Sequence, residues 1–312
     1  MTQIDRLNAF LTTEKPWLTD GGLETELIFT HGIDLPSFAS LYTFDSTEGR
    51  AALAAYYDSF VDTAIRAGTG FMIDTATWRS GGYWGEALGE TTDRLIAANR
   101  AAVEAARAVE ARIAGRIPTL INGTVGPAGD GYAPDRLYDA DTAQAIHADQ
   151  VGWLKEAGVD MISAVTMTHP GEAIGFLRAA RAAGMPAAVS FTVETDGHLP
   201  NGQSLADAIE ETDAAAEGYA LYFMINCAHP DHFKDRLSGD WLARIGGIRA
   251  NASRMSHAEL DAAEELDPGD ASEFGALHGD LARRLPALRV IGGCCGTCHD
   301  HVDHAARHVL AA

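Results

Sequence analysis

The chain has 312 residues and a formal net charge of −21, because 44 Asp and Glu outnumber 23 Lys and Arg. Such an excess of acid argues against nucleic acid or an anionic membrane surface as a partner. No apolar run is long enough to span a bilayer, and the first residues lack the apolar segment of a signal peptide. Four cysteines are too few for a disulfide scaffold. We therefore expect a cytoplasmic protein with reduced thiols and small-molecule partners; whether it forms a homo-oligomer is left open.

Short apolar segments alternate with helical patterns along the chain. We expect strands at 16–19, 71–77, 118–123, 159–165, 187–193, 219–226, 245–251 and 288–292. We expect helices at 2–11, 47–67, 91–115, 139–157, 171–183, 204–217, 230–237 and 272–285, with a last one from about residue 300. A polar insert follows residue 251, and we expect its acidic part, 259–270, to be solvated.

The order of these elements predicts the fold class. Apolar strands that do not alternate with polar residues, each followed by a helix, indicate a parallel sheet covered on both faces. Eight such units in a chain of this length indicate an α/β protein of the (β/α)8 TIM-barrel type. The alternative, a doubly wound open sheet, lacks the G-x-G-x-x-G expected after its first strand. We predict one barrel domain over residues 1–312, with its active site at the carboxyl ends of the strands.

Three cysteines follow two of the predicted strands. Cys227 ends the sixth strand, and Cys294 and Cys295 end the eighth. Neighbouring side chains on a strand point to opposite faces, so the backbone must bend for all three to face one centre. Glycines there should permit the unusual φ and ψ values: Gly292, Gly293 and Gly296. Three thiolates with Zn²⁺ would form a site that leaves a fourth position open. The alternative is three buried structural thiols.

Four motifs resemble those of one enzyme family. They are Asp20-Gly21-Gly22, the stretch 123–127, Asn226-Cys227 with Pro230, and the stretch 292–297 that reads GGCCGT. Together they resemble the homocysteine S-methyltransferase family over essentially the whole chain. The resemblance implies a TIM barrel in which Cys227, Cys294 and Cys295 bind Zn²⁺ and the acceptor thiol completes the coordination. It also implies that Asp20 holds the ammonium group of homocysteine, and that methionine is the product.

The resemblance extends to the rest of the site. Gly21, Gly22, Asn226 and Thr166 would lie beside the acceptor, and no side chain would act as a catalytic nucleophile. The methyl donor would be a small onium compound such as S-methylmethionine, S-adenosylmethionine or betaine. A cationic donor suits an aromatic wall. The candidates for the donor pocket are Thr77, Trp78 and Arg79, with Tyr83 and Trp84 as further aromatic residues.

The sequence departs from the family at the end of the fourth strand. Family members commonly carry a Glu there that contacts the ammonium group, and this chain has Val165. Either Asp20 acts alone, or Glu194 or Asp74 substitutes, or the acceptor is a different thiol or selenol. Two further functions stay open: a zinc hydrolase, and a catalytically silent barrel that binds zinc or a thiol.

Two residues have competing interpretations. Cys298 forms C-G-T-C with Cys295, so it could belong to a redox pair or act as a fourth zinc ligand. We expect a nearby thiol that does not bind the metal, because Cys298 lies outside the family motif. Asp20 could instead stabilise only a turn, since Asp-Gly-Gly is common in turns.

Overall fold

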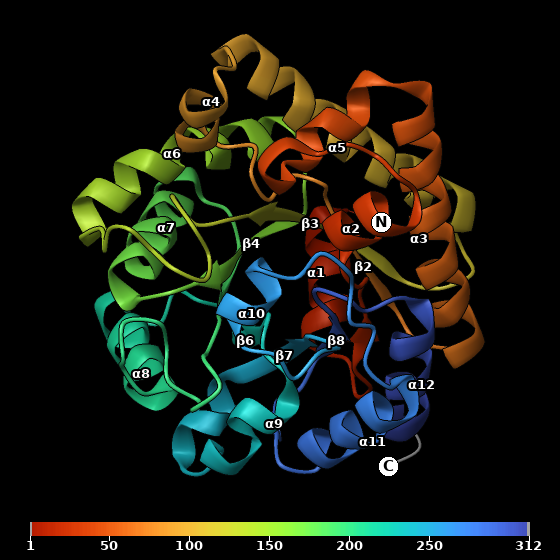
Figure 1. Cartoon of the computed structure of the whole chain (residues 1–312), viewed down its shortest axis with the longest axis vertical. Coiled ribbons are helices and arrows are strands. Elements are labelled where there is room, and N and C mark those ends of the chain that lie inside the picture. Colours follow the sequence, from red (N-terminus) through yellow and green to blue (C-terminus); the bar gives the residue numbers. More distant parts are fainter. Residues whose placement is uncertain (1, 311–312) are drawn as a thin grey trace.

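Eight parallel strands close into a barrel in the order β1 to β8 (Figure 1). The computed structural model describes residues 2–310. The strands are β1 (Trp17–Leu18), β2 (Phe71–Asp74), β3 (Thr119–Val125), β4 (Met161–Met167), β5 (Ala187–Phe191), β6 (Phe223–Asn226), β7 (Ile245–Ala250) and β8 (Val290–Gly293). Trp17 pairs with Val290, which joins the first strand to the last. The predicted (β/α)8 barrel is confirmed.

Helices form the outer ring of the barrel (Figure 1). They are α3 (Thr47–Ala67), α5 (Thr92–Ile113), α6 (Ala140–Ala157), α7 (Pro170–Ala183), α8 (Leu205–Ala215), α9 (Pro230–Phe233), α11 (Ala271–Ala282) and α12 (His299–Leu310). The side chain of Ser46 caps the start of α3, and Gly68 ends that helix in the left-handed conformation. None of the described helices is long and apolar enough to cross a membrane.

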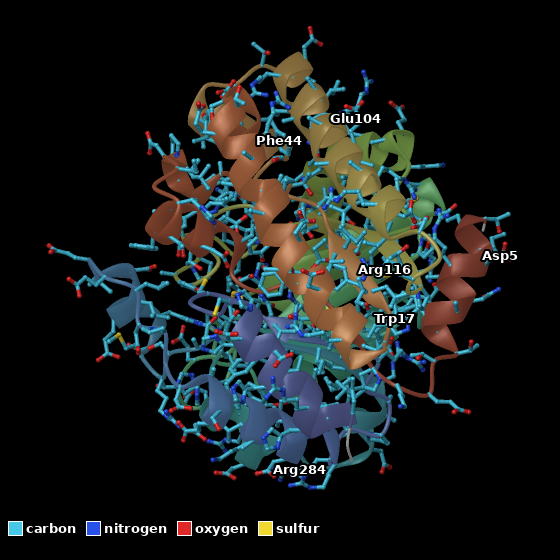
Figure 2. All side chains as sticks on the ribbon, turned by 90° about the vertical axis from the view of Figure 1, so that its right-hand side faces the viewer. Asp5, Trp17, Phe44, Glu104, Arg116 and Arg284 are labelled. Carbon is cyan, nitrogen blue, oxygen red and sulfur yellow. A yellow bond between two sulfur atoms is a disulfide. The ribbon has the colours of Figure 1, made fainter. Side chains whose placement is uncertain are left out.

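The helix α1 (Gln3–Leu11) closes the amino end of the barrel. The ring of Phe10 is completely buried and lies 5.4 Å from that of Trp17 and 5.7 Å from that of Tyr222, between ring centroids. Figure 2 shows α1, which carries the labelled Asp5, at one end of the molecule, and the blue segment after β7 at the other. The amino end is therefore filled, and the carboxyl ends of the strands remain for a site.

Several short helical segments were not predicted. They are α2 (Leu23–Thr25), a π-helix η1 (Glu26–Thr30), the 3-10 helices η2 (Pro36–Phe38), η3 (Ser40–Asp45) and η5 (Asp240–Arg244), and the α-helices α4 (Gly82–Leu88) and α10 (His257–Asp261). The predicted helix 230–237 is present as α9 followed by the 3-10 helix η4 (Lys234–Arg236). Segments this short show too few turns for a helical period to be visible in the sequence.

Candidate active site

The three predicted cysteines meet at the carboxyl ends of β6 and β8. Cys227 directly follows β6, and Cys294 and Cys295 directly follow β8. The sulfur atoms of all three lie within 4.8 Å of one another. The three sulfur atoms therefore converge as expected from the sequence. This arrangement does not fit the alternative of three separate structural thiols.

In this structure the sulfur atoms of Cys227 and Cys294 are joined as a disulfide, while Cys295 is free. The donor set fits a zinc ion once that bond is reduced, because three thiolates on one centre match a zinc site with an open fourth position. Cys298 does not belong to this group of sulfurs. Its Sγ lies 3.4 Å from Nδ1 of His301, as expected for a thiol outside the metal site.

Two residues near the sulfurs have a left-handed backbone, although neither is glycine. The φ angle is 52° at Cys227 and 64° at Thr166. The side chain of Asn226 holds the turn at Thr166: its Oδ1 accepts from the backbone N–H of Thr166 at 2.9 Å, and its Nδ2 donates to Thr166 Oγ1 at 2.8 Å. Asn226 Nδ2 also lies 3.9 Å from Cys294 Sγ. Strained conformations of this kind persist where the surroundings fix them.

The glycines of the cysteine loop do not all have the predicted role. Of the three, Gly296 alone adopts a positive φ, 78°. Gly292 instead allows close packing, because a Cβ there would lie 2.6 Å from the carbonyl oxygen of Asp20. Gly22 does the same from the other side, since its Cβ would lie 2.6 Å from the carbonyl oxygen of Cys294. The expectation of unusual φ and ψ values at Gly292 and Gly293 was wrong, because neither has a positive φ. Glycine is needed at these two positions because a Cβ would clash with neighbouring atoms.

Asp20 and Asp74 share a buried cation that sequence reasoning did not consider. Arg249, on β7, forms ion pairs with both carboxylates. Its Nε also donates to the carbonyl oxygen of Gly293 at 3.1 Å. Burial raises the pKa of Asp20 to about 7, an effect that the charge of Arg249 opposes. A lone Arg in an otherwise apolar strand was the signal that could have identified this residue.

Val165 and the two carboxylates that could replace the missing Glu, Glu194 and Asp74, lie in different environments. Val165, at 6% exposure, lines the same pocket as the cysteines and packs against the apolar floor of the barrel. Glu194 does not line that pocket, and its Oε1 lies 3.0 Å from Nδ1 of His257. Asp74 lines the pocket but is already paired with Arg249.

The aromatic residues predicted for the donor pocket contact a cation of the protein, the guanidinium group of Arg79. The guanidinium carbon of Arg79 lies 4.5 Å from the ring centroid of Trp78 and 4.0 Å from that of Trp84. All three residues line the pocket, whereas Tyr83 and Thr77 do not. The hydroxyl of Thr77 is buried and donates to the carbonyl oxygen of Thr124 at 2.7 Å. The indole faces are thus in contact with a protein cation in this structure.

The polar insert after β7 covers the site. Most of the stretch 259–270 is exposed, as expected for a solvated insert. Six of its residues nevertheless line the pocket: Leu260, Asp261, Ala263, Glu265, Leu266 and Asp267. His257 begins α10 and its Nε2 lies 2.8 Å from the carbonyl oxygen of Cys227. Tyr132, from the loop after β3, stacks on His257 at 3.9 Å and lines the pocket. Sequence reasoning missed both residues, since neither lies at a strand end.

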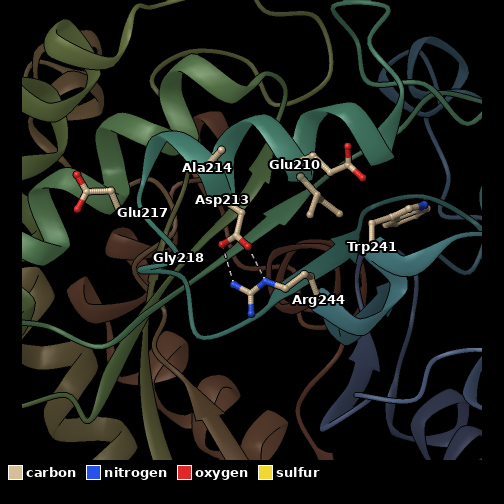
Figure 3. A pocket seen from close by; sticks show the side chains of 8 residues that line it. Glu210, Asp213, Ala214, Glu217, Gly218, Trp241 and Arg244 are labelled. Carbon is tan, nitrogen blue, oxygen red and sulfur yellow. Dashed lines mark hydrogen bonds and ion pairs between the residues drawn. The ribbon is translucent and has the colours of Figure 1, made fainter.

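The resulting pocket has a volume of about 490 Å3. The predicted acceptor residues Asp20, Gly21, Gly22, Asn226 and Thr166 all line it beside the three cysteines. A second hollow, of about 430 Å3, lies on the outer ring between α8 and the segment before β7 (Figure 3). Its Arg244 is paired with Asp213, and it contains none of the cysteines. The chemistry of the molecule is therefore concentrated at the carboxyl end of the barrel.

Comparison with known proteins agrees with this geometry. The fold is similar to the homocysteine methyltransferase MmuM from Escherichia coli in its oxidized form, with 23% identity, a TM-score of 0.73, and coverage of 97% of this chain and 99% of that one. The metallated form of MmuM gives 22% identity at the same TM-score and coverage, and the apo form 21% at 0.67. No curated protein sequence matches. The sequence matches the homocysteine S-methyltransferase family over residues 17–309, so the chain belongs to that family and is an S-methyltransferase with a thiol acceptor.

Proposed function

We propose that this chain is a zinc-dependent enzyme that moves a methyl group from a small onium donor to the thiolate of homocysteine, giving methionine. The observation that carries the proposal is the convergence of the Cys227, Cys294 and Cys295 sulfurs within 4.8 Å at the floor of an open pocket. Family membership supports the acceptor class. The cytoplasm, where such thiols stay reduced, is the proposed location.

The three cysteines would hold the metal after reduction of the Cys227–Cys294 bond. Zinc bound there would lower the pKa of an acceptor thiol, which is mostly protonated at neutral pH when free. The residues around the sulfurs fix their positions. Asn226 holds the turn at Thr166, and Thr166 Oγ1 lies 3.8 Å from Cys227 Sγ. His257 contacts the carbonyl oxygen of Cys227, which orients that backbone from the opposite side.

The reaction needs no side chain as nucleophile. The acceptor sulfur would attack the methyl carbon of the donor, the new carbon–sulfur bond would form as the bond to the onium atom breaks, and that atom would leave with the electron pair as a neutral thioether or amine. The thiol proton would pass to solvent. The task of the protein is then to hold the two substrates in line, which a pocket walled by two loops can do.

Three other candidates have less support. A zinc hydrolase has less support because the family that the sequence matches transfers methyl groups to a thiol. A different thiol or selenol acceptor is favoured by one observation, the apolar side chain of Val165 in the pocket. A catalytically silent barrel is disfavoured by family membership.

The proposal is tested by assaying reduced, zinc-loaded protein with homocysteine and each of four donors: S-methylmethionine, S-adenosylmethionine, betaine and a dimethylsulfonium compound. We expect methionine with at least one of them. Formation of the product by protein stripped of zinc at an undiminished rate would refute the role of the metal, and methylation of other thiols alone would refute homocysteine as the acceptor.

A further inference from the structure

We propose that Glu24, rather than Asp20, is the residue that binds the α-ammonium group of the acceptor amino acid. This inference rests on the proposed transfer of a methyl group to homocysteine and names a residue that determines its specificity. Glu24 belongs to α2, the three-residue helix directly after the Asp20-Gly21-Gly22 motif, and its side chain lines the pocket.

The place of Glu24 next to the cysteines follows from its neighbours in the chain. On one side, Gly22 approaches Cys294 so closely that a Cβ would lie 2.6 Å from its carbonyl oxygen. On the other side, Thr25 Oγ1 accepts from the backbone N–H of Gly296 at 3.2 Å. The helix α2 is thus attached at both ends to the loop that carries Cys294 and Cys295.

Asp20 cannot readily take the same role, because its carboxylate already has partners within the protein. Arg249 pairs with both Asp20 and Asp74. Thr19 Oγ1 lies 3.2 Å from Asp74 Oδ2 and 3.4 Å from Asp20 Oδ1, and Asn122 Nδ2 donates to Asp74 Oδ1 at 2.7 Å. A ligand ammonium at Asp20 would share a carboxylate whose Oδ1 is already paired with a buried guanidinium, so it would gain less there than at a carboxylate without an ion pair.

Glu24 differs from the other carboxylates of the pocket. Within residues 2–310 it forms no ion pair, and burial raises its pKa although the charges of Arg79 and Arg249 oppose the shift, so a cation in direct contact would stabilise the anion. The remaining acidic residues of the pocket lie on the loop after β3 or on the insert: Asp130, Asp261, Glu265 and Asp267. Glu24 is therefore the unpaired carboxylate on the segment fixed to the cysteine loop.

Because Val165 replaces the Glu that commonly contacts the ammonium group, another carboxylate must take that role. The ammonium group of an amino acid keeps its charge at neutral pH and needs a hydrogen-bond acceptor when water is excluded. Val165 offers none from the β4 side of the pocket. The carboxylate of Glu24, which lines the same pocket from α2, would supply the missing charge.

The test compares homocysteine with 4-mercaptobutyrate, which is homocysteine without its amino group. The ratio of kcat/KM for the two thiols is measured with the donor that supports turnover, for the wild type, Glu24→Gln and Asp20→Asn. Binding of each thiol to the reduced, zinc-loaded protein is measured in parallel by calorimetry. We expect Glu24→Gln to lower kcat/KM and affinity for homocysteine about 10- to 100-fold while changing those for 4-mercaptobutyrate less than threefold.

The Asp20→Asn variant is the control within the same pocket. We expect it to lower kcat/KM for both thiols alike, because it disturbs Arg249 and not the ammonium group. Loss of the preference for homocysteine in Asp20→Asn, with that preference intact in Glu24→Gln, would overturn the inference. If the wild type methylates 4-mercaptobutyrate as well as homocysteine, the inference fails while the transferase function stands. If the wild type methylates neither thiol, it is the proposed function that fails, and thiol binding by the Glu24 variant still tests the ammonium contact.

Discussion

The phenol oxygen of Tyr132 lies 3.3 Å from the sulfur of Cys295, although 163 residues separate the two in sequence. The Tyr132 ring stacks on His257, which in turn contacts the carbonyl oxygen of Cys227 and the carboxylate of Glu194. The loop after β3 and the insert after β7 are thereby connected to cysteines on both β6 and β8. Two segments that the strand pattern does not describe thus support the proposed metal site.

This contact predicts a role for the Tyr132 hydroxyl in metal affinity. Tyr132→Phe keeps the ring on His257 and removes the hydrogen bond to Cys295. Groups that support metal ligands typically change metal affinity by about 10- to 100-fold, so we expect zinc affinity to fall by about tenfold. Competition with a chromophoric chelator measures it. Tyr83→Phe, whose ring does not line the pocket, is the control, and equal affinities of Tyr132→Phe and wild type would contradict the prediction.

The arrangement of the sulfurs predicts that Cys295 and Cys298 differ in function. Cys295→Ser should reduce zinc affinity by at least about 100-fold, because it removes one of three soft ligands. Cys298→Ser should keep wild-type zinc content, since the Cys298 sulfur is paired with His301 instead. Metal analysis of the reduced proteins after dialysis distinguishes the two. A loss of zinc in Cys298→Ser equal to that in Cys295→Ser would show that the site has four protein ligands.

The bond between Cys227 and Cys294 predicts that zinc uptake depends on reduction. A thiolate is the form that binds zinc, so the oxidised protein should offer one ligand sulfur in place of three. We expect the protein oxidised in air to take up less than a tenth of an equivalent of zinc, and the protein treated with a phosphine reductant to take up one. Thiol titration under denaturing conditions should give two free cysteines before reduction and four after it. Full zinc uptake by protein with two free cysteines would contradict the assignment.

A buried carboxyl in η1 predicts a pH dependence of stability. Burial raises the pKa of Glu26 from 4.5 to about 7, and its Oε2 is buried without a hydrogen-bond partner in the described structure. The folded state therefore binds a proton more tightly than the unfolded state. The contribution of Glu26 to the free energy of unfolding is favourable at low pH and falls as the pH rises from about 4.5 to about 7.

The variant Glu26→Gln removes that contribution. Urea unfolding at pH 5 and pH 7.5 should show a smaller loss of stability for Glu26→Gln than for the wild type over this interval. Glu14→Gln, at an exposed position, is the control and should follow the wild type. A wild-type loss that Glu26→Gln reproduces in full would assign the pH dependence to other groups.

The strand order and the convergence of the three cysteines could be predicted from the sequence because both depend on local signals. Apolar strands without alternation identify a parallel barrel, and a barrel places the residues after β6 and β8 at the same end. The bounds of α3, Thr47–Ala67, were predicted to the residue, since Ser46 caps its start and Gly68 ends it. Strand ends were less accurate; β6 begins at Phe223, four residues after the apolar run that predicted it.

The walls of the pocket could not be predicted in the same way. Glu24 lies in α2, a helix of three residues that is followed by π-helix and 3-10 helix without a regular period, and the insert has the composition of a solvated loop. The partner of Asp20 was missed for a different reason. Arg249 lies in an apolar strand, where a charge must find a buried partner, but the sequence does not say which carboxylate of the barrel will supply it.

The most direct test of the account is the amount of methylated thiol formed by reduced protein with and without its metal. Wild type, Cys295→Ser and Cys298→Ser would each be loaded with zinc, given homocysteine and the donor that supports turnover, and assayed for methionine by mass spectrometry. The account predicts product from wild type and Cys298→Ser, and a fall of at least about 1000-fold in Cys295→Ser and in wild type stripped of zinc. Undiminished product from Cys295→Ser without bound zinc would contradict it.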